Sequence, residues 1–415
     1  MEPIRFEAEV LYVEDMPAAT LAAEYGTPLY VYSRRAIAES WQRFDAAFDG
    51  FSHRVCYAVK ANSNLGVLSL LAELGASFDI VSIGEMERVL RAGGRADRIV
   101  FSGVGKQSHE IEAALAAGIA CINVESGSEL TRIGEIAART GFRAPVSLRV
   151  NPDVDARTHP YISTGLRENK FGVPVDEAMT LYRRAADMPM VDIVGIDCHI
   201  GSQINALAPF TDALARILAL VDELAATGIE LAHIDLGGGI GVQYKDETPL
   251  DIEEYAGAIR QAMGHRRDAL WFEPGRYLVA NAGLLLTRVV TLKDSEEKHF
   301  AVVDAAMNDL IRPALYDAWQ RVTRVEPGPG RNETWDIVGP VCETGDFLAK
   351  DRHLSLAEGD LLAIHSAGAY GFVMSSNYNS RSRAAEVIVA GDQSQCVRTR
   401  ETIDDQLRLE RKFTL

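Results

Sequence analysis

Residues 55–101 read VCYAVKANSNLGVLSLLAELGASFDIVSIGEMERVLRAGGRADRIVF, and their pattern repeats through the first two thirds of the chain. Helical segments separate three short apolar runs: Val55–Val59, Phe78–Val81 and Ile99–Phe101. Ser82 and Glu85 fit a capping box, in which both side chains bind free amides at a helix start. Gly75 and Gly93 stand where helices are expected to end, because glycine tolerates the left-handed backbone found there. Alternating strands and helices predict a parallel sheet.

The alternation continues to about residue 276. Further β-rich runs follow the first three: Cys121–Val124, Val146–Val150, Ile193–Cys198, His233–Leu236 and Leu270–Phe272. Ser126 and Glu129 fit a second capping box. The complete set has eight strand–helix units over roughly 220 residues, which favours a closed (β/α)8 TIM-like barrel over an open sheet.

Helix signals become sparse after about residue 280. The strand-like runs in this part are Leu284–Leu292, Phe300–Val303, Trp335–Val338, Leu361–Ile364 and Ala385–Val389. They predict a second, mostly β domain, which the apolar N-terminal strand Leu29–Tyr32 could join. We therefore expect an α/β plus β protein. Its barrel spans residues 30–278, and its β-rich domain comprises residues 1–29 and 279–415.

Composition excludes several classes of partner. The 42 lysines and arginines against 59 aspartates and glutamates give a formal charge of −17. Nucleic acid and anionic membranes both demand basic surface, so neither is the expected main partner. The five cysteines include no Cys-x-x-Cys pair, which argues against a disulfide framework or a thiolate metal site. With no apolar signal segment or membrane span, we expect a cytoplasmic protein.

In a barrel of this kind, the residues that follow each strand form the active face. That rule selects Lys60 after the first strand and His199 after the sixth. It also selects Gly237–Gly239 after the seventh strand and Glu273–Arg276 after the eighth. These residues are the candidates for chemistry, and each has a purely structural alternative.

Lys60 could form a Schiff base if partly desolvated, although a lone lysine at a strand end more often extends its amine to solvent. Three consecutive glycines are usually a turn. After the seventh strand of a barrel, however, their bare amides favour a phosphate site, which Gly275 and Arg276 could complete. Glu273 is either a buried partner of Arg276 or a carboxylate that keeps a pyridine nitrogen protonated. His199 is either a core histidine or a ring that stacks on a flat ligand. Together these groups describe a pyridoxal phosphate site.

The same motifs resemble those of the fold type III pyridoxal phosphate decarboxylases, and within them the diaminopimelate decarboxylases, along nearly the whole chain. The resemblance rests on YAVKAN at residues 57–62, CHIGSQ at 198–203, DLGGG at 235–239 and EPGR at 273–276. It implies that Lys60 binds the cofactor, that His199 stacks on its ring and that Glu273 holds its pyridine nitrogen. It implies a phosphate site formed by Ser202, Gly237, Gly238, Gly239, Gly275 and Arg276.

The resemblance extends into the β-rich domain, through MNDLIRPALY at residues 307–316, VCETGD at 341–346 and SAGAY at 366–370. It implies that Cys342 protonates the substrate's α carbon, from a segment that reaches the neighbouring subunit's site. Cys342 could instead be a small buried apolar residue. The resemblance assigns substrate binding to Arg276, Arg312, Tyr316, Glu343 and Tyr370, with Tyr370 also at the cofactor. Without the resemblance, we would interpret Arg312 as a surface charge on a helix. HPYISTG at 159–165 and KFG at 170–172 resemble the family's mobile active-site loop.

The implied reaction is the decarboxylation of meso-2,6-diaminopimelate to L-lysine and CO2, the last step of lysine biosynthesis, by a homodimer with shared active sites. Arg276 and Arg312 suit a substrate with a distal carboxylate, because a guanidinium binds carboxylates through two parallel hydrogen bonds. Decarboxylases of ornithine, arginine or carboxynorspermidine are the main alternatives. An amino-acid racemase, a barrel aldolase that uses Lys60 without the cofactor, and a binding-only homologue are the others.

Overall fold

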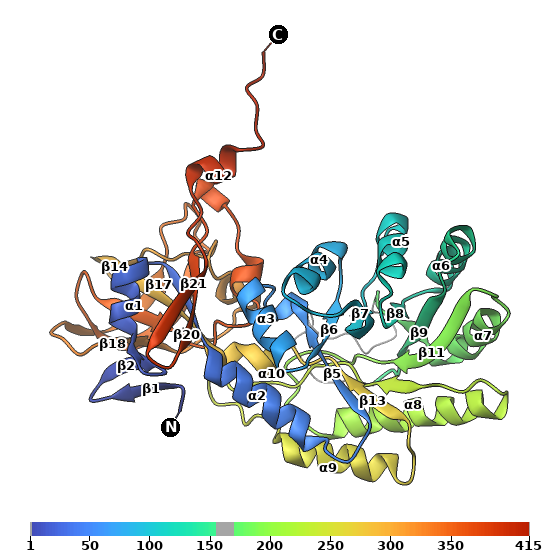
Figure 1. Ribbon diagram of the computed structural model, residues 1–415. Helices are drawn as coiled ribbons and strands as arrows, with labels where there is room; N and C mark the ends of the chain where they lie inside the picture. Colours follow the sequence, from blue (N-terminus) through green and yellow to red (C-terminus); the bar gives the residue numbers. More distant parts are fainter. Residues whose placement is uncertain (1, 155–169, 415) are drawn as a thin grey trace. The chain divides into compact units, whose positions relative to one another are not determined.

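The computed structural model describes residues 2–154 and 170–414, and the chain divides into two units (Figure 1). The barrel unit comprises Ser40–Gln243 and Glu247–Leu278. The β unit comprises Met1–Glu39, Tyr244–Asp246 and Val279–Leu415. No helix in the described ranges is long and apolar enough to cross a membrane.

The barrel unit contains a closed parallel barrel, as predicted. Its strands follow one another in sequence order: β5 (His53–Ala58), β6 (Ser77–Ile80), β7 (Ile99–Phe101), β8 (Cys121–Val124), β9 (Ala144–Asn151), β11 (Val191–Asp197), β12 (His233–Asp235) and β13 (Ala269–Phe272). β8 pairs in parallel with β9, and β13 pairs in parallel with β5, which closes the ring. The short β10 (Val173–Pro174) pairs with β9. All strand carboxyl ends therefore point to one mouth, where the predicted site residues of the barrel unit lie.

Helices follow the strands and lie outside them (Figure 1). They are α3 (Leu65–Glu73), α4 (Ile83–Arg91), α5 (Ser108–Ala117), α6 (Gly127–Thr140), α7 (Val175–Ala186), α8 (Ala208–Ala226) and α9 (Ile252–Met263), while α2 (Arg34–Ala47) spans the unit boundary. The predicted capping boxes form only in part. Ser82 caps α4 by accepting the N–H of Glu85, but the Glu85 carboxylate accepts the N–H of Val81 rather than that of Ser82. Gly118 and Gly141 end α5 and α6 with φ values of 72° and 77°, which glycine adopts without strain.

The β unit is built on a sheet in the order β18 (Phe347–Leu356), β17 (Arg331–Val338), β15 (His299–Val303), β14 (Gly283–Asp294), β4 (Leu29–Ser33), β20 (Ala385–Ala390) and β21 (Gln393–Arg398). β16 (Val322–Arg324) and β19 (Leu361–Ile364) pair with each other, and β19 pairs with β14. The N-terminal strand β4 lies between β14 and β20, so it does join this sheet. The predicted boundary at residue 30 therefore falls inside the β unit, which continues to Glu39.

Smaller elements complete the β unit. Near the N-terminus these are β1 (Ile4–Glu7), β2 (Val10–Val13), β3 (Met16–Pro17) and α1 (Ala18–Tyr25). Its apolar core joins the N-terminal and C-terminal parts of the chain through Leu11, Leu29, Val31, Leu284, Leu286 and Val387. The short helices α10 (Arg276–Val279), α11 (Arg312–Tyr316) and α12 (Ile403–Leu407) lie in the C-terminal part of the sequence.

Candidate active site

Lys60 lies directly after β5, in the 3-10 turn Val59–Ala61. Its Nζ donates a hydrogen bond of 2.5 Å to Oδ2 of Asp79, a fully buried residue of β6. The Lys60 side chain is 34% exposed, so the amine lies at the barrel mouth and its charge is balanced from inside the barrel. Sequence reasoning missed Asp79. A carboxylate within an otherwise apolar strand was the available signal.

Glu273 follows β13 and is buried. Its Oε1 accepts hydrogen bonds from Oγ of Ser102 at 3.2 Å and from Nδ2 of Asn123 at 3.4 Å. Burial, followed by the nearby negative charges of Asp79, Asp235 and Asp197, raises the pKa of Glu273 well above its usual range.

Within the described residues, Glu273 forms no ion pair with Arg276. The structural alternative that paired these two residues is therefore wrong. Arg276 instead donates a hydrogen bond of 3.0 Å from Nη2 to Oγ of Ser202.

Asp197, Asp235 and Glu273 form a cluster of buried acids, whose carboxylate oxygens lie within 4.8 Å of one another. Asp235 accepts the N–H of Gly237 at 2.9 Å, and burial together with neighbouring acids raises its pKa to about 7. Nε of Arg149 lies 3.9 Å from Oδ2 of Asp197. Glu273 differs from the other two because its described hydrogen-bond donors are neutral side chains. Its carboxylate therefore suits a further cationic partner.

His199 lies one residue beyond Cys198, after the end of β11. Its Nδ1 accepts the N–H of Gly238 at 3.1 Å, so a neutral ring carries its proton on Nε2. Loss of hydration, and then the positive charges of Arg149 and Lys60, hold the pKa of His199 well below its usual range. A neutral, flat imidazole fixed at this mouth can stack on an aromatic ligand.

The glycines after β12 leave no room for side chains. A Cβ on Gly238 would stand 2.2 Å from the carbonyl oxygen of Glu273. Gly239 has a φ of +103°, and a Cβ there would stand 2.5 Å from the carbonyl oxygen of Gly201. Gly237 also has a positive φ, of +64°. This close packing brings the chain after β12 against the residues that follow β11 and β13, next to the Ser202–Arg276 hydrogen bond.

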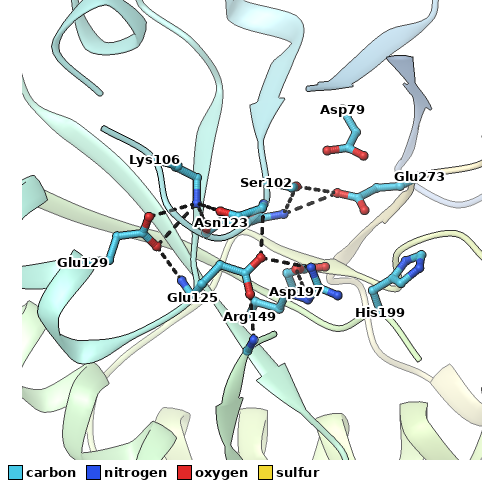
Figure 2. Close-up of polar contacts among 12 residues, drawn as sticks. Asp79, Ser102, Lys106, Asn123, Glu125, Glu129, Arg149, Asp197, His199 and Glu273 are labelled. Atoms are coloured by element: carbon cyan, nitrogen blue, oxygen red, sulfur yellow. Dashed lines mark hydrogen bonds and ion pairs between the residues drawn. The ribbon is translucent and has the colours of Figure 1, made fainter. Parts of the chain in front are cut away.

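The structure adds a buried ionic network that sequence reasoning missed (Figure 2). The side chain of Lys106 is 1% exposed and lies 3.2 Å from the Glu129 carboxylate, and burial lowers its pKa. Glu125 accepts Nη1 of Arg149 at 3.0 Å and the N–H of Gly172 at 2.7 Å. Polar residues at the ends of β8 and β9 were the available signal, because the strand-end rule was applied only to the other strands and passed over them.

The predicted active-site loop is described only at its end. Residues 159–165 lie outside the described residues. The described part, Lys170–Gly172, is attached to the ionic network, since Gly172 binds Glu125 and the ring centre of Phe171 lies 4.9 Å from Cζ of Arg149.

In the β unit, Arg312 is buried at the start of α11, with Cζ 4.5 Å from the ring centre of Tyr244. The alternative reading of Arg312 as a surface charge is therefore wrong. Tyr316 ends α11 and is partly exposed. Tyr370 is also partly exposed and has a φ of 54°. Sequence reasoning gave no signal for Tyr244.

Cys342 and Glu343 are exposed. Their segment is held by the main chain, because Asp346 accepts the N–H groups of Val341 and Met307 at 2.8 and 2.6 Å. The N–H of Cys342 donates to Oδ1 of Asn379 at 2.7 Å. The alternative of Cys342 as a small buried residue is therefore wrong, and its thiol remains accessible in the single chain.

Comparison with known proteins accords with this geometry. Residues 34–280 match the family model described as "Pyridoxal-dependent decarboxylase, pyridoxal binding domain". The chain belongs to this family of cofactor-dependent lyases.

Its full-length relatives narrow the class. The chain is 60% identical over 404 residues to diaminopimelate decarboxylase of Pseudomonas fluorescens, with 97% of each chain covered. The solved diaminopimelate decarboxylase of Helicobacter pylori, complexed with L-lysine, matches with a TM-score of 0.92 and 44% identity, covering 94% of this chain and 98% of that one. The solved diaminopimelate decarboxylase of M. jannaschi matches with a TM-score of 0.94 and 37% identity, covering 99% and 98%. Within the family, this chain belongs to the diaminopimelate decarboxylases.

Proposed function

We propose that Lys60, Glu273 and Cys342 carry out the decarboxylation of meso-2,6-diaminopimelate to L-lysine and CO2, the last step of lysine biosynthesis, with pyridoxal phosphate as cofactor. The observation that carries this proposal is the barrel mouth. An accessible amine there lies 2.5 Å from a buried carboxylate, beside a second buried carboxylate held by neutral donors. The Lys60 amine suits covalent attachment of the cofactor, and the Glu273 carboxylate suits the cofactor's ring nitrogen.

The residues present fit pyridoxal phosphate. When bound, it supplies an electron sink for the electron pair that remains after CO2 departs. Lys60 would hold it covalently through Nζ, and Asp79 fixes the position of that amine. The flat ring of His199 would lie against it. Gly237–Gly239, Gly275, Ser202 and Arg276 would bind the phosphate, since the glycines allow close approach and Arg276 supplies positive charge.

Glu273 would keep a proton at the ring nitrogen. An anionic carboxylate next to a protonated nitrogen forms a charge-assisted hydrogen bond, which is stronger than a neutral one. The ionised form of Glu273 is costly in this acid cluster despite the nearby charge of Lys60, as its raised pKa indicates. A cationic ring nitrogen would remove that cost. The same pairing would therefore serve both cofactor binding and catalysis.

Protonation of the α carbon after CO2 loss requires an acid that can reach the barrel mouth, and an acid supplied by a neighbouring protomer must be exposed on its own chain. Cys342 meets that condition, and its main-chain contact to Asn379 fixes its position. We assign it to the active site of the neighbouring protomer, so that Lys60 of one protomer works with the partner's Cys342. Glu343, exposed beside it, would bind the ammonium group at the distal end of the substrate.

Selection of a substrate with two amino-acid centres requires a group for the distal carboxylate. Arg312 has the right chemistry, because its guanidinium is buried and its Cζ lies over the ring of Tyr244. Arg276, Tyr316 and Tyr370 would complete the substrate contacts. An enzyme for a simple diamine-forming reaction has no need of such an arginine.

The proposed assembly is a homodimer with shared active sites. Besides Cys342 and Glu343, the β unit exposes large apolar side chains near the C-terminus, with Leu409 83% and Phe413 87% exposed. Apolar groups exposed together often mark a protein interface. We also propose a cytoplasmic location, since all five cysteines are free thiols, as is usual in reducing compartments.

Release of CO2 tests the reaction. The cofactor-loaded protein is offered meso-diaminopimelate, L-ornithine, L-arginine and carboxynorspermidine in parallel, with the Lys60→Ala variant as the inactive control. We expect turnover of diaminopimelate alone, with L-lysine as product. Preference for another substrate would refute the assignment of Arg312, and turnover of none would refute the proposed reaction.

A further inference from the structure

The buried acids at the barrel mouth differ in how their charge is balanced. Asp79 is paired with Lys60, and Asp197 lies near Arg149. Asp235 accepts a main-chain N–H. Glu273 alone is held by neutral side chains, and the hydrogen bonds that its carboxylate accepts within the described residues both go to Oε1 (Figure 2).

Those two side chains are themselves fixed. Nδ2 of Asn123 also donates to Oγ of Ser102 at 3.1 Å, so the pair forms a small triangle with Glu273 Oε1. The main-chain oxygen of Asn123 accepts Nζ of Lys106 at 2.7 Å. Lys106 also donates to the main-chain oxygen of Gly103 at 2.7 Å. The buried ammonium of Lys106 therefore joins the residues that follow β7 to the end of β8. These contacts hold the segments that carry both donors to Glu273.

We propose that Ser102 and Asn123 are positioning residues for the cofactor's ring nitrogen, because they bind Oε1 of Glu273, leave Oε2 for that nitrogen and stabilise the ionised carboxylate. The inference rests on the proposed function, since it assumes that Glu273 faces the ring nitrogen. It assigns a role to two residues that neither the strand-end rule nor the motifs selected.

Neutral donors suit this task for a physical reason. Burial and three neighbouring acids favour the protonated form of Glu273, and the nearby charge of Lys60 opposes them. Two hydrogen bonds to Oε1 also favour the ionised form. A lysine or arginine in their place would also stabilise the carboxylate, but it would compete with the cationic ring nitrogen for it. Ser102 and Asn123 orient the carboxylate without neutralising it.

The test uses Ser102→Ala and Asn123→Leu, which remove the donors with little change in volume. The matched control is Ser147→Ala, which removes a buried hydroxyl from the neighbouring strand β9. The Ser147 hydroxyl has no hydrogen-bond partner among the described residues. The readouts are cofactor affinity, the near-visible absorbance of the bound cofactor against pH, and the pH profile of kcat.

Loss of either donor raises the pKa of Glu273, so the ring loses its partner at a higher pH. We expect the acid limb of the absorbance and kcat profiles to move upward by about one pH unit per donor, since such a bond corresponds to about one unit. Cofactor affinity should fall about tenfold. Ser147→Ala should leave all three unchanged, and its melting temperature should not fall, since it breaks no described hydrogen bond.

Unchanged pH profiles and cofactor affinity in Ser102→Ala would overturn the inference, whatever happens to kcat at a single pH. A profile that moves equally in Ser147→Ala would do the same, because it would indicate a general effect on barrel stability. Failure of the proposed reaction is distinguishable. In that case the wild type turns over no substrate, while cofactor affinity and absorbance still report on Glu273.

Discussion

The two units differ in how their predicted site residues are held. In the barrel unit these residues are enclosed, as Glu273 is by Ser102 and Asn123, and Lys60 reaches a buried carboxylate. In the β unit, Cys342 and Glu343 are exposed. Their segment is held by hydrogen bonds from its main chain and by a side-chain hydrogen bond between Glu343 and Tyr378. The barrel has therefore completed most of its own polar contacts, whereas the Cys342 segment presents functional groups to something outside the unit.

This difference separates two kinds of requirement. Binding a charged ring at a buried acid cluster demands a rigid, water-poor site, which a closed barrel provides. Delivery of a proton by Cys342 to a neighbouring protomer demands a group that can be reached from outside its own unit. Substitutions confined to one unit therefore test this difference.

Mixing two inactive variants tests most directly whether the active sites are shared between protomers. Lys60→Ala and Cys342→Ala should each lose activity by about 10³-fold or more, since each removes a group that acts in bond making or proton transfer. If sites are shared, random exchange of protomers should restore about a quarter of the wild-type activity, because half the dimers are hybrids with one intact site. Steady-state CO2 release after exchange measures the restored activity.

The experiment requires proof that protomers exchange between dimers. Recovery of two differently tagged protomers in one dimer supplies that proof. Proven exchange without recovery would contradict shared sites and place Cys342 with Lys60 of its own chain, or outside the reaction altogether. The exposed variant Lys350→Ala, from the β unit, is the control for loss of a lysine.

A glycine substitution tests how closely the barrel mouth is packed. Gly238→Ala should reduce cofactor affinity by about 100-fold or more, because its Cβ would overlap the main-chain oxygen of Glu273 and both segments would have to move. Gly257→Ala is the control. Gly257 is exposed in α9 with open space around its Cβ, so that change should stabilise the protein by about 0.5–1 kcal/mol. Cofactor titration and urea unfolding distinguish the two, and equal cofactor affinity would contradict the close packing.

Much of the barrel could be predicted because the signals are local. Each barrel strand lies within two residues of its predicted position at either end. The acids and amides inside the mouth were missed because they belong to the strands themselves. Asp79 and Asn123 sit among apolar neighbours. Asp79 meets Lys60 through the pairing of β5 with β6, and Asn123 meets Glu273 across the closed barrel.

The β unit was harder to predict for a different reason. The edge strand β18 reads FLAKDRHLSL, whose charged residues suit a half-exposed edge but give no apolar run to detect. The stacking of Arg312 on Tyr244 joins residues far apart in the sequence, and no local pattern encodes such a contact. The motif around Arg312 nevertheless identified the residue, through resemblance rather than through physical reasoning.

Arg312→Lys tests substrate selection in the β unit. Lysine keeps the charge but loses the planar stack and the two parallel hydrogen bonds to a carboxylate. L-Lysine retains the distal carboxylate of diaminopimelate, so its affinity should fall by about 10- to 100-fold. Binding of cadaverine, which has no carboxylate, should change little, and so should cofactor affinity. Calorimetric titration measures both ligands. An equal loss for cadaverine would indicate a structural role for Arg312.

Asp235→Asn tests the cost of the acid cluster in the barrel. Its pKa is raised to about 7 in the folded protein from an ordinary value of 3.8, so the folded state binds more protons between those values. The free energy of unfolding of the wild type should therefore fall as pH rises through this window, by at most about 1.4 kcal/mol per pH unit. Asparagine keeps the acceptor for Gly237 but cannot ionise, so its unfolding free energy should fall less steeply. Urea unfolding from pH 5 to about pH 8, with exposed Asp212→Asn as the control, measures the difference, and parallel curves for all three proteins would contradict a buried, proton-binding cluster.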